Sequence, residues 1–138
     1  MDLKTLLADL NKDLTLEYAA AVQYVQHYGR VTGPQYMSIR EQIGDHAKEE
    51  LGHALVLSDM IQYYGGNPSA EVGKVLLAAD VGGMLRDNLA SENVAIQRYR
   101  KRIQDCESLG MYELAEQIRD IISDELDHAN DLKLALGK

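Results

Sequence analysis

The feature that constrains this chain most is a trio of glutamate and histidine residues that occurs twice at one spacing. Each member of the first trio has a partner of the same residue type 75 positions further along. The six residues are Glu17, Glu50, His53, Glu92, Glu125 and His128. One Glu from each of two helices and Glu-x-x-His from each of two others make the ligand set of a di-metal carboxylate site. The repeat therefore predicts an all-α chain with four helices packed around this set.

Four long segments have the apolar periodicity and composition of helices. They cover about residues 3–31, 36–64, 80–108 and 111–136. In the first segment the inward stripe that carries Glu17 also includes Ala21, Tyr24 and Tyr28. The link at Leu109-Gly110 is tight, whereas the connection around residues 65–79 is longer than neighbouring antiparallel helices need. The pattern predicts a four-helix bundle made of two helical hairpins joined by a long crossover.

Composition narrows the function classes. The length of 138 residues predicts a single domain over residues 1–138. A net charge of −8 argues against nucleic acid or an anionic membrane surface as a partner. Cys106 is the only cysteine, so an internal disulfide is excluded, and we expect an ordinary helix residue there. The chain shows no secretory signal and no apolar run that could cross a bilayer, so we expect a cytoplasmic protein.

The spacing within each Glu-x-x-His segment explains why these residues can share metal ions. Residues three apart lie on one helical face with about 4.5 Å of rise between them, so both side chains reach the same point of the bundle axis. Four carboxylate charges balance two divalent ions, and mixed oxygen and imidazole ligands suit iron, manganese or cobalt. We expect Glu50 and Glu125 to bridge the two ions. The other ligands should pair as Glu17 with His53 and Glu92 with His128.

The sequence also predicts roles for several neighbours of the six residues. Glu49 and Asp124 could accept a hydrogen bond from the outer ring N–H of a ligand histidine, or could be solvated helix charges. His46 is expected to be a hydrogen-bonded core residue rather than a ligand. Tyr24 and Tyr99 should cap the site by packing. The Tyr24 phenol could also donate a hydrogen bond to a bound oxygen species or supply an electron.

The ordered motifs resemble the ferritin-like superfamily, and most closely the bacterioferritins. The resemblance covers nearly the whole chain and includes residues 84–90, Met-Leu-Arg-Asp-Asn-Leu-Ala, ahead of Glu92. It implies a ferritin-like bundle that holds two iron ions per chain (manganese being the other candidate). It also implies a ferroxidase that oxidises Fe²⁺ with O₂ or H₂O₂ for iron storage or detoxification, in a homo-oligomer.

The sequence departs from its relatives at three places. Haem-carrying bacterioferritins have Met directly after the Glu of the first Glu-x-x-His, and Leu51 stands there, so no haem is expected. The chain ends ten residues after His128, without the fifth helix of cage-forming relatives, so a dimer is as consistent as a cage. Rubrerythrins carry an extra Glu where Ala95 stands here, together with Cys pairs that this chain lacks, so their peroxidase chemistry is disfavoured.

Two other functions stay open at this point. One is a di-iron or di-manganese oxidase, oxygenase or peroxidase that acts on another substrate. The short chain argues against it, because little material is left for an organic-substrate pocket. The other is a metal-binding scaffold without catalytic activity.

Overall fold

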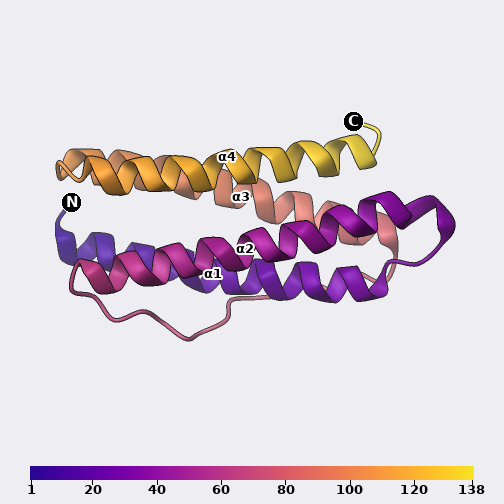
Figure 1. Ribbon diagram of the computed structural model, residues 1–138, viewed down its shortest axis with the longest axis horizontal. Helices are drawn as coiled ribbons and strands as arrows, with labels where there is room; N and C mark the ends of the chain where they lie inside the picture. The colour runs from indigo at the N-terminus through magenta and orange to yellow at the C-terminus, as the bar shows by residue number, and fades with distance from the viewer.

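The computed structural model describes residues 1–138 and is all-helical. Its elements are α1 (Leu3–Arg30), the 3₁₀ turn η1 (Pro34–Tyr36), α2 (Met37–Tyr63), α3 (Val81–Ser108) and α4 (Tyr112–Ala135). Helix α1 packs along α2, and α3 along α4, so that two hairpins form a four-helix bundle (Figure 1). The predicted fold class is confirmed, and each predicted helix end lies within one residue of the observed one.

Polar caps and glycines define the helix ends. The carboxylate of Asp2 accepts a hydrogen bond from the Thr5 amide at 2.8 Å at the start of α1. Asp80 accepts one from the Gly83 amide at 3.0 Å at the start of α3. Gly65 has φ +92° just after α2, where a residue with a side chain would be strained. These signals are local, which explains why the sequence predicts the ends so closely.

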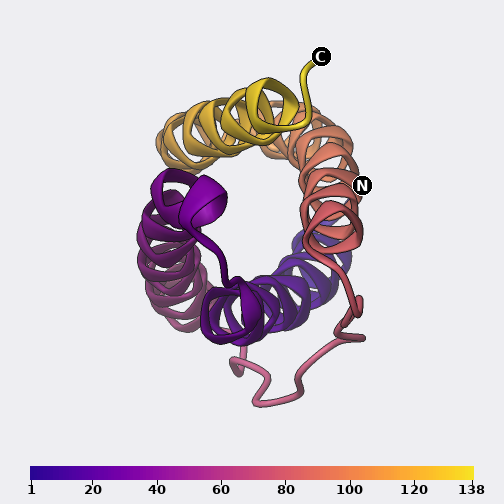
Figure 2. The same ribbon diagram turned by 90° about the vertical axis from the view of Figure 1, so that its right-hand side faces the viewer.

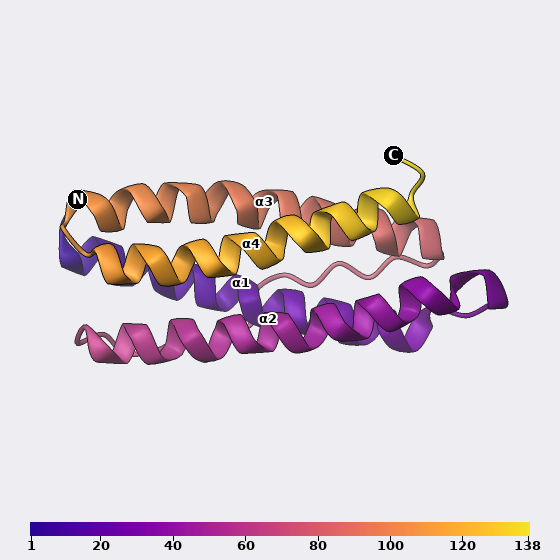
Figure 3. The ribbon, with the colours of Figure 1, turned by 45° about the horizontal axis from the view of Figure 1, so that its top comes forward.

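The crossover between α2 and α3, residues 64–80, runs the length of the bundle on the outside of α1. Viewed from the end, α1 and α4 lie diagonally opposite and the crossover passes outside the ring of helices (Figure 2). Its amide at Gly73 donates to the Thr15 carbonyl of α1 at 3.0 Å. A Cβ at Gly73 would lie 3.2 Å from that oxygen, so glycine permits this close approach. Figure 3 shows the last part of the crossover running to the start of α3.

Two apolar clusters fill the interior. One contains Leu6, Leu10 and Leu14 of α1, and the other lies around Tyr24 and Ile43. Glu17 lies between Leu14 and Tyr24 in sequence, so the polar residues of the predicted site occupy the middle of the bundle between the clusters. None of the helices combines the length and the apolar character that a bilayer crossing requires.

The prediction that Tyr28 points inward is wrong. Its side chain is exposed, and its ring lies under the guanidinium of Arg40, 3.9 Å from ring centre to Cζ. The inward position near the end of α1 belongs to His27, which is fully buried. A helical stripe can continue at the third or the fourth residue after Tyr24, and here it continues at the third.

Candidate metal centre

The four helices bring the six predicted residues together in the middle of the bundle. All six are buried, with exposed fractions between 1% and 5%. They form two overlapping groups of possible ligands, each with its ligand atoms within 4.8 Å of one another. The groups share Glu50 and Glu125; Glu17 and His53 complete one, and Glu92 and His128 complete the other. This is the grouping predicted from the sequence, although the role of each residue as a ligand stays a prediction.

Both histidines turn the same ring nitrogen toward the carboxylates. His53 Nδ1 lies 3.2 Å from Glu125 Oε1, and His128 Nδ1 lies 3.1 Å from Glu50 Oε1. The outer Nε2 atoms point away from the centre, to Asp124 at 2.8 Å from His53 and to Glu49 at 3.2 Å from His128. An acceptor on Nε2 places the proton there and leaves the Nδ1 lone pair for a metal. The predicted contacts of Glu49 and Asp124 are therefore present, each across the bundle between α2 and α4.

Two tyrosines orient the carboxylates that come singly from α1 and α3. Tyr24 donates its phenolic hydrogen to Glu92 Oε1 at 2.6 Å, and Tyr99 donates to Glu17 Oε1 at 2.5 Å. Each bond joins α1 to α3, so the two are symmetric copies of one arrangement. Burial, reinforced by nearby carboxylates, raises the pKa of both phenols well above 10.0, so both stay protonated as donors. The tyrosines thus hold one oxygen of each carboxylate and leave the second free.

The buried charges shift one another strongly. Burial and the charge of Glu17 raise the pKa of Glu125 to about 8. Burial and the charges of Glu17 and Glu125 raise the pKa of Glu50 well above 4.5. Burial would lower the pKa of His53, but the carboxylates of Glu125 and Glu17 beside its ring outweigh burial and raise that pKa to about 11. The same competition raises the pKa of His128 to about 9. Without metal, the centre therefore holds protons that an ion would replace.

The unpaired atoms at the centre fit a pair of metal ions. Five buried polar atoms there have no hydrogen-bond partner: Glu17 Oε2, Glu50 Oε1, His53 Nδ1, Glu92 Oε2 and Glu125 Oε1. Native interiors leave few such atoms, and five of the eight in this chain lie at the centre. Four carboxylates and two imidazoles suit iron or manganese, and they carry the charge that balances two divalent ions.

His46 is confirmed as a hydrogen-bonded core residue. Its ring lies 4.1 Å from the ring of His128, centre to centre, and its Nε2 contacts Asp131 Oδ2 at 3.0 Å. It belongs to neither group of possible ligands. Burial lowers the pKa of His46, so the ring is neutral beside the centre at neutral pH.

Sequence reasoning did not identify a polar layer that joins α1 to α3 on both sides of the carboxylates. On one side Asp13 accepts from Arg98 at 2.9 Å and from Arg102 at 2.6 Å. On the other side Asn88 Oδ1 accepts from Gln23 at 2.9 Å and lies 2.9 Å from His27 Nδ1. The internal repeat could have indicated these contacts. Its 75-residue offset pairs Asp13 with Asn88, Gln23 with Arg98 and His27 with Arg102. The two networks are therefore related by the same internal repeat as the centre.

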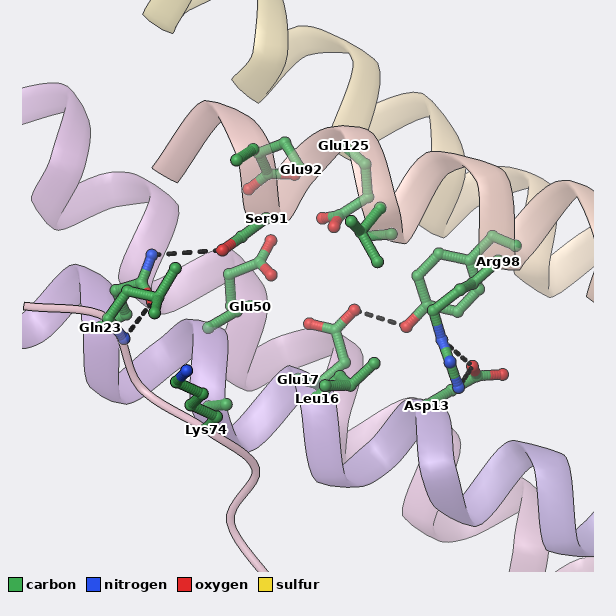
Figure 4. Close-up of a pocket in the computed structure, with 17 residues that line it drawn as sticks. Asp13, Leu16, Glu17, Gln23, Glu50, Lys74, Ser91, Glu92, Arg98 and Glu125 are labelled. Atoms are coloured by element: carbon green, nitrogen blue, oxygen red, sulfur yellow. Dashed lines mark hydrogen bonds and ion pairs between the residues drawn. The ribbon is translucent and has the colours of Figure 1, made fainter. Parts of the chain in front are cut away.

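A pocket of about 200 Å³ opens onto the carboxylates between α1 and α3. The pocket is lined by four carboxylates that point toward one another, those of Glu17, Glu50, Glu92 and Glu125 (Figure 4). Neither histidine of the centre lines the pocket. Much of the remaining lining is apolar: Leu16, Ala19, Ala20, Leu76, Ala90, Val94, Ala95 and Tyr99. The sequence predicted little material for an organic-substrate pocket, and the cavity present here is small and shares its floor with the carboxylate centre. Alanines on both facing helices leave space there.

Fold and site together define a four-helix-bundle protein of the di-metal carboxylate class, with two helical hairpins and a buried Glu/His cluster. The chain belongs to the ferritin family, because the ferritin-like domain matches residues 7–138.

Two relatives place the chain within this family. It is 27% identical over 128 residues to a bacterioferritin of Brucella melitensis, a match that covers 92% of this chain and 80% of the relative. A solved Bacillus anthracis structure, described as a ferritin-like, diiron-carboxylate protein, superposes with a TM-score of 0.93. That match has 34% identity and covers 99% of both chains. The resemblance predicted from the motifs is thus confirmed.

Proposed function

We propose that this protein is a ferroxidase: it binds two Fe²⁺ ions per chain and oxidises them with O₂ or H₂O₂. The observation that carries the proposal is the pair of overlapping ligand groups that share Glu50 and Glu125. Each Fe²⁺ gives up one electron, so two ions and two protons convert one O₂ to H₂O₂, or one H₂O₂ to two waters. The Bacillus anthracis relative described as a diiron-carboxylate protein and the Brucella bacterioferritin support iron over manganese.

We assign the roles as follows. Glu50 and Glu125 bridge the ions, since each belongs to both groups. Glu17 with His53 completes the ligands of one ion, and Glu92 with His128 completes those of the other. Six protein ligands leave positions open, as a reactive site requires. No haem is expected, because Leu51 stands where the haem-binding relatives have Met.

The direct test is an anaerobic titration with Fe²⁺ followed by O₂. We expect two Fe²⁺ to bind per chain and to be oxidised rapidly to Fe³⁺ on mixing. Glu50→Gln keeps the shape of the side chain but removes one charge from both groups, so it should abolish two-ion binding and the fast oxidation. Glu41, on the same helix, is exposed, and Glu41→Gln is the matched control. A wild-type protein that binds two Fe²⁺ but oxidises them no faster than Glu50→Gln would be a scaffold, not a ferroxidase.

Tyr24 offers a more specific test. We propose that its hydrogen bond to Glu92 orients that carboxylate and that its phenol can supply a hydrogen bond or an electron during oxidation. Tyr24→Phe should slow the oxidation phase about tenfold, the cost of losing one charge-assisted hydrogen bond. The exposed Tyr112 provides the control Tyr112→Phe, measured by stopped-flow absorbance. Unchanged kinetics in Tyr24→Phe would leave Tyr24 a packing role only.

A second function is an oxidase or oxygenase that acts on an organic molecule. The specific observation in its favour is the pocket between α1 and α3, which four carboxylates of the centre line directly. Oxidation of Fe²⁺ alone does not require an apolar pocket of this size. Continued uptake of iron over many turnovers supports the ferroxidase, whereas a single oxidation that stops at two Fe³⁺ supports the second function.

A further inference from the structure

We propose that the pocket between α1 and α3 binds a small amphipathic carboxylate of about eight non-hydrogen atoms. In this arrangement its apolar end lies against Ala20 and Ala95 and its carboxylate lies at Lys74. This proposal rests on the second candidate function, in which an organic molecule binds beside the carboxylate centre. Binding of the ligand in the pocket does not require metal, so ligand binding and metal binding can be tested separately.

Size and lining set the class of ligand. A dry apolar cavity of 150 Å³ holds benzene, which has six carbon atoms, so a pocket of about 200 Å³ holds about eight non-hydrogen atoms. Ala20 and Ala95 are equivalent positions of the internal repeat, three residues after Glu17 and Glu92 respectively. Because both side chains stop at Cβ, the helices face each other there across space instead of across packed side chains. Ligand pockets commonly combine apolar walls of this kind with a few polar groups that fix the orientation of the ligand.

The crossover closes one side of the pocket and fixes the position of Lys74. Its amides on either side of that residue are bound to α1: Gly73 donates to the Thr15 carbonyl at 3.0 Å, and Leu76 donates to Gln23 Oε1 at 2.9 Å. Gln23 is itself held from the other helix, since its amide nitrogen lies 3.3 Å from Ser91 Oγ (Figure 4). The backbone on both sides of Lys74 is therefore held against α1, and the exposed Lys74 side chain lines the pocket.

Charge decides the orientation of the ligand. The pocket has two cationic residues, and Arg98 already pairs with Asp13 at 2.9 Å, whereas Lys74 has no acidic partner within the chain. The floor carries four glutamates, which repel an anionic group and would attract an ammonium group. The carboxylate of the ligand consequently stays at the rim with Lys74, and the hydrocarbon end points to Ala20, Ala95 and the carboxylate centre.

The experiment uses hexanoate, hexan-1-ol and hexylammonium as probes on metal-free and Zn²⁺-loaded protein with ¹³C-labelled alanine methyl groups. We expect hexanoate to shift the methyl signals of Ala20 and Ala95 with a Kd on the order of 1 mM. Hexan-1-ol should bind more weakly and hexylammonium most weakly. Lys74→Gln should weaken hexanoate about fivefold and leave hexan-1-ol unchanged.

A second set of variants tests the pocket by filling it with larger side chains. Ala95→Leu, or Ala20→Leu from the opposite wall, should abolish hexanoate binding, whereas Ala8→Leu on an exposed position of α1 should not. Circular dichroism and the zinc content of each sample verify that the variants fold. The inference is overturned if hexanoate shifts no pocket methyl, if both filled variants bind it normally, or if hexylammonium binds as tightly. A protein that binds two zinc ions but no hexanoate would refute the ligand pocket and leave the metal proposal intact. A protein that binds hexanoate but not two zinc ions would refute the metal proposal and leave the pocket intact.

Discussion

At the scale of single residues, the centre depends on acids that are not themselves predicted ligands. Asp124 accepts from His53 Nε2 at 2.8 Å, and Glu49 lies 3.2 Å from His128 Nε2. Both acids are partly exposed, with exposed side-chain fractions of 43% and 46%, yet each fixes a buried imidazole. Helix surfaces usually carry such charges for solubility, so their residue type alone does not distinguish them. Their position distinguishes them, because each stands one residue before a Glu that both groups of possible ligands share.

Asp124→Asn tests this orienting role. An amide can present its NH₂ group to Nε2, which would favour the opposite tautomer and place a proton on Nδ1. We therefore expect about 10- to 100-fold weaker binding of a metal ion at the group that contains His53. Competitive titration with a chelator and Zn²⁺ gives the affinity. Asp120→Asn, an exposed acid one turn earlier on α4, is the control, and an equal loss in both variants would contradict the idea.

At the scale of elements, the hairpins are local structures, whereas their assembly depends on buried polar contacts between α1 and α3. Arg102 is buried and binds both Asp13 of α1 and Asp105 of its own helix. Its pairing with Asp13 therefore forms only when the two hairpins are docked, whereas Asp105 lies on the same helix. The equivalent contact in the other half joins His27 to Asn88 and is neutral, because burial lowers the pKa of His27.

We expect Asp13→Ala to lower the free energy of unfolding by about 3–5 kcal/mol, because it leaves the Arg102 guanidinium buried without its main partner. Glu107→Ala removes an exposed ion pair to Arg119, 2.6 Å long, and should cost less than about 1 kcal/mol. Urea unfolding of the metal-free proteins measures both values. Similar small losses in the two variants would show that the buried network contributes little to docking.

The elements also show what the sequence could and could not predict. Helix ends follow local signals such as Asp80 and Gly65, so they were predicted within one residue. The six residues of the centre were predicted because the internal repeat doubled a rare pattern. Neither the pocket nor the ion pairs that Asp13 makes were predicted, because both depend on which side chains of α1 and α3 face each other. Ala20 and Ala95 look like ordinary helix residues until the two helices are placed together.

At the scale of the whole molecule, the carboxylate centre makes stability depend on pH. The pKa values of Glu125, His128 and His53 are all raised by folding, to about 8, 9 and 11. A group whose pKa is raised stabilises the fold fully below its unfolded pKa, and that contribution is lost as pH rises through the folded value. The metal-free protein should therefore become less stable with rising pH.

We expect the Tm of the metal-free protein to fall by several degrees between about pH 6 and pH 9. Metal ions replace the same protons, so the Zn²⁺-loaded protein should gain stability relative to the metal-free form over this range. Glu125→Gln removes one titrating group and should flatten the pH dependence of the metal-free form. Scanning calorimetry at each pH is the measurement. A metal-free Tm that rises with pH would contradict the assignment of these shifts.

The surface of the first hairpin bears on assembly. Most of the exposed large apolar side chains lie on α1 and α2. They include Val22, Val25, Leu51 and Leu55, with exposed fractions of 40%, 55%, 54% and 69%. On the second hairpin the comparable side chains are fewer, and Val94 among them lines the pocket. Exposed apolar side chains that are concentrated on one pair of helices favour contact with another protein surface.

We propose that a second copy of the chain covers this hairpin and that the protein is at least a homodimer. A symmetric contact would place equivalent apolar residues of both copies together, and a stable one would bury about 1,200–2,000 Å² in total. Leu55→Glu introduces two charges at such a contact and should shift the protein to monomer in light scattering. Leu134→Glu places the same charge on α4 at a similarly exposed position, 65%, and should leave the assembly unchanged. A wild-type protein that is monomeric at about 100 μM would refute the dimer. A loss of assembly in Leu134→Glu alone would place the interface on the second hairpin instead.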